Sequence, residues 1–201
     1  MLRYFTLFLA GILLLTSCQD ENKAKQPELT ASEQYNQQGI AMISSARDTI
    51  SIHKGLYLLD KAIATDSNNI AAYNNKIGTL LQLQQVEKAL ATIQLLNTKT
   101  AIPDYVLFEG MIYERHGRDT AKANQKYREA IALYDKEIAK QPNESQIHIG
   151  KGIAVMLKDG KEAGIAYYDS LKPQFEHDEF YKVNLKQYYE FDRVKFLEEL
   201  W

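Results

Sequence analysis

The sequence predicts an all-α fold, because three features of its pattern agree. Apolar residues recur at the spacing of one helix face, as in Tyr73, Ile77, Leu80 and Leu81. Long runs that alternate β-branched and polar residues, which are typical of half-exposed strands, are absent. Short polar segments separate the helical stretches at 67–69, 116–119, 141–144 and 158–161. Helix pairs that recur every few dozen residues indicate a repeat protein.

The composition is that of an ordinary globular chain. Of 201 residues, 45% are hydrophobic and 25% are charged, with a formal net charge of −2. The chain has no block of basic residues, and a slightly acidic surface repels phosphate backbones. Nucleic acid is therefore not an expected partner.

Residues 1–17 have the pattern of a secretory signal peptide. Arg3 precedes twelve uncharged residues, Tyr4 to Leu15, and the small residues Thr16 and Ser17 follow. The apolar run is shorter than the ~20 residues that a membrane-spanning helix needs. We therefore expect residues 1–17 to direct export and to be removed.

The segment from Leu15 to Cys18 resembles the lipobox of bacterial lipoproteins, in which an aliphatic residue and two small residues precede the cysteine. Cys18 is the single cysteine of the chain, and it lies where that motif requires one. The resemblance implies that Cys18 carries the lipid and becomes the first residue of the mature protein. Attachment of two or more acyl chains gives stable membrane anchoring. Gln19 differs from the aspartate that marks inner-membrane retention in enteric lipoproteins, so the outer membrane is favoured, with the domain facing the periplasm or the surface.

The polar segment that follows, 18–31, is predicted to be a flexible tether between the lipid and the folded domain, because it is aperiodic and contains Pro27. Without disulfides, the domain must be stabilised by packing alone. Residues 32–172 then hold about four helix pairs. Their expected packing positions are Tyr35, Gly39, Gly55, Leu59 and Ala62; Tyr73, Ile77, Gly78, Leu80, Ala89, Ile93 and Leu96; Val106, Gly110, Tyr113, Ala123, Tyr127 and Ala130; and His148, Gly152, Val155, Gly164, Tyr168 and Leu171.

This arrangement of small and large residues resembles the tetratricopeptide repeat (TPR). The match is best over 66–96 and weaker in the last two pairs. The resemblance implies a right-handed α-solenoid of TPR-like helix pairs. Small residues let two helices cross at about 8–10 Å, and each pair leaves an apolar side that the next pair covers.

Two further elements are expected in the C-terminal half. The helical pattern that starts near Ala123 is about two turns longer than a standard second helix, and we expect it to end before Pro142. The register inside that stretch is open, since Ala130 and Tyr134 also start a consistent pattern. Residues 173–201 are rich in aromatic side chains and are predicted to form a capping helix pair, with an interaction surface as the alternative.

The sequence predicts no enzyme, no cofactor and no metal site. His53, His116, His148 and His177 are scattered, and no His-Glu-x-x-His pair, phosphate loop or nucleophile elbow is present. Consecutive residues of the His177, Asp178 and Glu179 run point apart on a helix. We expect His148 to be a partly buried structural histidine.

The TPR resemblance implies that a protein or peptide binds on the concave face, which is formed by the first helix of each pair. The residues carried over to that face are Asn36, Ile40, Asn74, Gly78, Leu81, Leu107, Met111, Glu114, Arg115, Ile149, Ile153 and Met156. Their amide and apolar side chains suit an amphipathic helix or an extended peptide. Internal packing of several of them is the alternative, if the register differs by one residue.

The function expected from the sequence is therefore that of a lipid-anchored adaptor that binds another protein or peptide of the cell envelope without chemistry of its own. An immunity protein or inhibitor, located in the envelope and binding a secreted toxin or hydrolase, is the alternative.

Overall fold

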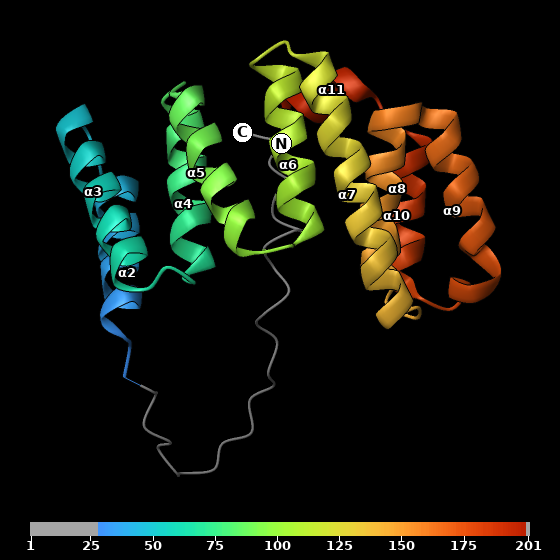
Figure 1. Cartoon of the computed structure of the whole chain (residues 1–201), viewed down its shortest axis with the longest axis horizontal. Helices are drawn as coiled ribbons and strands as arrows, with labels where there is room; N and C mark the ends of the chain where they lie inside the picture. The colour runs from blue at the N-terminus through green and yellow to red at the C-terminus, as the bar shows by residue number, and fades with distance from the viewer. Residues whose placement is uncertain (1–27, 200–201) are drawn as a thin grey trace. The chain divides into compact units, whose positions relative to one another are not determined.

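The structure is a computed structural model that describes residues 28–199, and these residues form helices and connecting turns (Figure 1). The predicted signal peptide, Cys18 and most of the predicted tether lie outside the described residues. The described helices fall into two compact units, α2–α4 and α5–α11. The prediction of an all-α, TPR-like fold is confirmed for the described residues.

The first unit contains α2 (Ala31–Ser44), α3 (Thr49–Thr65) and α4 (Ile70–Gln82), and each helix packs on the next. Each begins at a residue whose side chain caps it: Thr30, Asp48 and Asn69 accept hydrogen bonds from backbone amides of the first turn. The Asn69 side chain also donates to Ser32, which in turn donates to the Ala62 carbonyl (2.8 Å each), so polar contacts tie the three helices together.

Two glycines allow α2 and α3 to cross closely. A Cβ on Gly39 would lie 3.0 Å from the Gly55 carbonyl oxygen, and a Cβ on Gly55 would lie 2.8 Å from the Gly39 oxygen. The two backbones are therefore in contact, as the small residues of the repeat pattern predicted.

The second unit contains α5 (Val86–Lys99), α6 (Pro103–Arg115), α7 (Thr120–Lys140), α8 (Ser145–Asp159), α9 (Lys161–Phe175), α10 (Glu179–Tyr189) and α11 (Arg193–Glu198). Helices α5 to α9 pack in sequence order, each against the next. The long helix α7 ends two residues before Pro142, as expected. Tyr134 near its end is buried, so α7 packs along most of its length.

The crossings in the second unit combine a glycine with a large side chain. The Tyr127 ring of α7 lies against Gly110 of α6, and Met156 of α8 lies against Gly164 of α9. The sequence predicted a small residue on each helix of a crossing. At the first of these crossings the second helix supplies an aromatic ring that fills the space left by the glycine of the first, and at the other a methionine of the first helix fills the space left by the glycine of the second.

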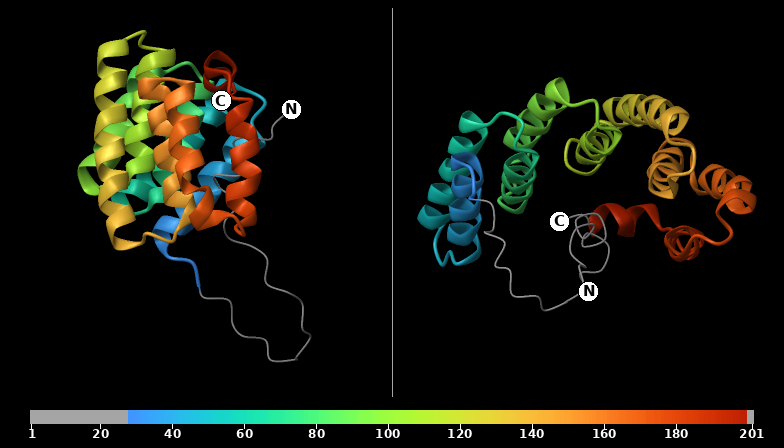
Figure 2. Two further views of the ribbon diagram at one scale, coloured as in Figure 1. Left: turned by 90° about the vertical axis from the view of Figure 1, so that its right-hand side faces the viewer. Right: turned by 90° about the horizontal axis from the view of Figure 1, so that it is seen from below.

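The two C-terminal helices, α10 and α11, pack against different helices of the second unit. Helix α10 packs on α8 and α9, as expected for a cap, and buries Tyr181 and Tyr188. Helix α11 instead reaches back to α6 (Figure 2). Both helices lie on the side of α6 and α8 that is turned away from α7, and we call this side the inner face of the second unit.

Candidate functional site

The C-terminal end of α6 holds the short helix α11 through Glu114. Arg193 of α11 donates from Nε to Glu114 Oε1 (2.6 Å) and from Nη2 to Glu114 Oε2 (2.8 Å). This is the two-bonded arginine–carboxylate geometry, which is stronger and more directional than a single ion pair. Glu114 is mostly buried, with 17% of its side chain exposed, so solvent screens this pair less than a surface pair.

Glu114 is oriented by a third donor. The Tyr127 hydroxyl of α7 donates to Glu114 Oε2 at 2.6 Å, and burial together with Glu114 raises the pKa of Tyr127 above its ordinary value. Tyr127 therefore remains a donor at physiological pH. The hydrogen bonds from Tyr127 and Arg193 therefore fix the position of the Glu114 carboxylate.

The neighbouring Arg115 binds the other end of α11. Its Nη1 donates to the Leu197 carbonyl oxygen. The last carbonyls of a helix have no partner within the helix, and a cation there also favours the helix dipole. Glu114 and Arg115, both predicted as site residues, therefore bind the first turn and the carbonyl end of one short helix.

The other predicted site residues fall into two groups. Six apolar side chains are buried, from 0% to 8% exposed: Leu81, Leu107, Met111, Ile149, Ile153 and Met156. Asn36, Ile40, Asn74 and Gly78 of the first unit are half-buried, and the Asn36 side chain accepts a hydrogen bond from Asn75 (2.9 Å). Burial of the six apolar residues corresponds to internal packing, and a binding role for either group stays a prediction.

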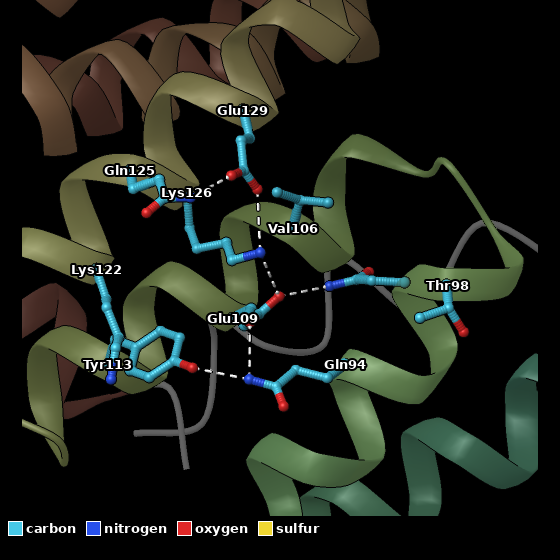
Figure 3. Close-up of a pocket in the computed structure, with 10 residues that line it drawn as sticks. Gln94, Thr98, Val106, Glu109, Tyr113, Lys122, Gln125, Lys126 and Glu129 are labelled. Atoms are coloured by element: carbon cyan, nitrogen blue, oxygen red, sulfur yellow. Dashed lines mark hydrogen bonds and ion pairs between the residues drawn. The ribbon is translucent and has the colours of Figure 1, made fainter.

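A polar pocket of about 490 Å³ lies between α5, α6 and α7 (Figure 3). Its centre is Glu109, which is 1% exposed. The Glu109 carboxylate accepts hydrogen bonds from Gln94 (3.2 Å) and Asn97 (2.9 Å), and the Lys126 ammonium lies 3.3 Å away. Gln94 also donates to the Tyr113 hydroxyl at 2.7 Å.

This network joins three successive helices, and the Glu109 carboxylate is satisfied by donors from two of them, while the buried Oδ1 of Asn97 has no hydrogen-bond partner within the part of the chain that the structure describes. A buried carboxylate requires such partners, because its desolvation is costly. The sequence analysis missed Glu109, although an acid inside the apolar run from Val106 to Ile112 is a signal for a buried polar contact. The network serves the packing of these repeats.

Two of the residues considered for catalysis, His148 and Asp178, have structural roles. His148 is 5% exposed, and both ring nitrogens lie 2.9 Å from protein oxygens, those of Tyr167 and the Pro142 carbonyl. This confirms the prediction of a structural histidine. His177 is exposed, and Asp178 caps α10 by accepting from the Tyr181 amide (2.9 Å). Hydrogen bonds from Ser145 and that amide lower the pKa of Asp178.

Residues 28–199 show neither a metal-binding cluster nor a membrane-spanning helix. This part of the chain holds no group of three or more His, Cys, Asp or Glu side chains placed to share a metal ion. Within the same range, every helix is too short or too polar to span a bilayer.

The known proteins to which this chain shows similarity are solved structures. No protein-family model matches the chain, and no curated protein matches it. Among solved structures, MamA from Desulfovibrio magneticus RS-1 is 17% identical, with a TM-score of 0.44 over 74% of this chain and 77% of that chain. A double mutant of MamA gives the same values. A tetratricopeptide repeat protein from Parabacteroides merdae ATCC 43184 is 12% identical, with a TM-score of 0.41 over 84% of this chain and 82% of that chain.

Successive helices pack on one another and several cross at a glycine, which is the arrangement of a helical-repeat protein. In residues 28–199 the chain is an all-α, TPR-like helical-repeat protein whose second unit holds its own C-terminal helix on its inner face.

Proposed function

We propose that this chain is a non-catalytic scaffold, anchored to a membrane of the cell envelope through acylated Cys18, that binds another envelope protein or peptide on the inner face of its second unit. The observation that carries the binding role is the contact of Glu114 and Arg115 with α11. The inner face accommodates a polypeptide helix through a charge pair and a backbone contact. These are the interactions by which a partner segment would be recognised.

The buried parts of the second unit support this role. Glu114 is held by Tyr127 on the neighbouring helix, so its carboxylate is ordered before a ligand arrives. A preorganised group loses less side-chain entropy on binding than a mobile surface residue. A rigid repeat that presents such groups is suited to binding. Of the histidines considered for catalysis, His148 is engaged in packing and His177 is exposed.

Partner capture tests the binding role. The full chain, with an affinity tag inserted between residues 19 and 27, is crosslinked in membranes and purified, which leaves Cys18 and α11 unaltered. We expect one envelope protein to be recovered with the unchanged chain and with the control Glu162→Arg, an exposed acid of α9. Recovery should be lost with Glu114→Arg.

The outcomes separate the parts of the proposal. Equal recovery with both variants means that another surface binds the partner. No recovery from the unchanged chain contradicts the scaffold function. Recovery of a secreted toxin or hydrolase instead of a resident envelope protein identifies the chain as an inhibitor that uses the same face.

Membrane placement is tested separately with Cys18→Ser. The serine hydroxyl does not accept the lipid, so we expect this variant in the soluble fraction after cell lysis, while the unchanged chain sediments with membranes. A Cys18→Ser chain that still sediments with membranes, and is extracted only by detergent, shows that the anchor is not at Cys18.

A further inference from the structure

The helix α11 buries little of its surface. It has six residues, and among them only Leu197 is buried. Val194 is 66% exposed, and Lys195 and Glu198 are exposed as well. The neighbouring helix α10 buries Tyr181 and Tyr188 in the unit. An element with little buried apolar surface opens at lower free energy than its surroundings.

The contacts of α11 with Glu114 and Arg115 are specific. Arg193 and Leu197 lie four residues apart, on one side of the helix, and meet the adjacent residues Glu114 and Arg115 of α6. Opposite charges therefore match at both ends: an arginine meets the glutamate, and the electronegative carbonyl end of the helix meets the arginine. A six-residue helix is ~9 Å long. The extended side chains of the adjacent residues Glu114 and Arg115 can therefore reach its two ends.

We propose that α11 is a displaceable cis ligand, and that the site formed by Glu114, Arg115 and Tyr127 binds a partner's helical segment of the same chemistry. Such a segment has an arginine in its first turn and an apolar residue four positions later. The helix of the segment ends near that apolar residue, so that a carbonyl oxygen of its last turn can accept a hydrogen bond from Arg115. The partner and α11 compete for the site. This inference rests on the scaffold function and adds the kind of segment that is recognised and the step that must precede binding.

Competition has a measurable consequence. A ligand that must displace an intramolecular segment binds with an apparent affinity equal to its intrinsic affinity multiplied by the fraction of time that the site is open. Weakening the segment without altering its site should therefore increase the affinity for an external copy of the same segment.

The test uses the full chain and a fluorescent peptide of residues 190–199 as the probe. By fluorescence anisotropy, we expect Arg193→Glu to bind this peptide at least tenfold more tightly than the unchanged chain does, because Glu114 is freed. Arg128→Glu, the same change at an exposed arginine of α7, should bind like the unchanged chain. The double variant Arg193→Glu with Glu114→Arg restores the internal pair and should lose the gain.

Two results would overturn the proposal. One is an Arg193→Glu chain that keeps its helical circular dichroism and binds the peptide no more tightly than the unchanged chain. The other needs no variant: hydrogen exchange of the unchanged chain in which the amides of α11 are as protected as those of α10. Partner capture tests the scaffold function, and peptide binding tests the displacement of α11. Either experiment can fail while the other succeeds, so failure of this proposal is distinguishable from failure of the scaffold function.

Discussion

The phenol ring of Tyr168 occupies the space beside Gly152 that any side chain at that position would need. A Cβ on Gly152 would lie 2.1 Å from Tyr168 Cζ, and Tyr168 is fully buried. Its hydroxyl donates to the Ile149 carbonyl at 2.6 Å, which fixes the ring along α8. The crossing of α8 and α9 therefore depends on one missing methyl group.

Gly152→Ala should lower the free energy of unfolding by about 1–3 kcal/mol, because the added carbon forces the ring out of its position. Urea denaturation measures this change. The control is Gly78→Ala, since no heavy atom of the unit that contains α4 lies within 4 Å of a Cβ there. Alanine in a helix is favoured over glycine, so this control should gain ~0.5–1 kcal/mol. An unchanged stability of Gly152→Ala contradicts the described crossing.

The last long helix, α10, is predicted to be part of the folded core. The Tyr188 ring stacks on Tyr168 with centroids 4.1 Å apart and planes 5° apart, and Tyr188 is 6% exposed. Tyr188→Ala should therefore cost about 3–5 kcal/mol, the range for truncating a buried aromatic residue. The adjacent Tyr189 is 43% exposed, so Tyr189→Ala should cost less than ~1 kcal/mol in the same thermal or urea unfolding measurement. Similar losses for the two variants would place α10 outside the core.

Glu109 should be needed for the packing of α5, α6 and α7. Glu109→Ala leaves Gln94, Asn97 and the Lys126 ammonium without their carboxylate, and removal of one partner of a buried pair costs about 3–5 kcal/mol. Because 24% of the Lys126 side chain is exposed, water compensates in part, and a loss of about 2–3 kcal/mol is expected.

The matched control for Glu109 is Glu129→Ala. Glu129 lies 3.0 Å from the same lysine, but 41% of its side chain is exposed, so its loss should cost less than ~1 kcal/mol. Differential scanning calorimetry compares the two. If the costs are equal, the buried network of Figure 3 does not stabilise the second unit.

The helices and their ends were predictable because their signals are local. Asp119 caps α7 by accepting from the Lys122 amide (3.0 Å), and the residue before Pro142 disfavours helical geometry, so the limits of this long helix follow from adjacent residues. Gly39 and Gly55 likewise marked a close crossing, because few other reasons place glycine inside a helix.

The contact of α11 with α6 was not predictable, for a physical reason. Arg193 and Glu114 lie 79 residues apart, and no local pattern distinguishes an arginine that pairs inside the chain from one in solvent. The same limit applied to Met111 and Ile153. Their spacing placed them on first helices of the repeats, but spacing does not tell whether other side chains cover that face, and in the structure both are buried.

Asp104 should make stability depend on pH in the direction opposite to Asp119. Burial raises its pKa above the ordinary value, while the hydrogen bond from the Tyr134 hydroxyl opposes that shift. A carboxyl group with a higher pKa in the folded state binds its proton more tightly when folded. Its contribution to the free energy of unfolding is therefore largest at low pH and decreases as the pH rises from about 3.9 through the raised pKa.

Asp104→Asn removes this titration and keeps an acceptor for Tyr134. We expect the stability of the unchanged chain relative to Asp104→Asn to fall with rising pH across that window and to stay constant above it, in urea unfolding from about pH 3.5 to about pH 7. Asp119→Asn supplies the opposite sign, since hydrogen bonds from Lys122 lower the pKa of Asp119 and its contribution is lost as the pH falls. If the stability difference between the unchanged chain and Asp104→Asn does not vary with pH, water reaches the Asp104 carboxylate. The N-terminal turn of α6 is then more open than the contact of Asp104 with Tyr134 of α7 indicates.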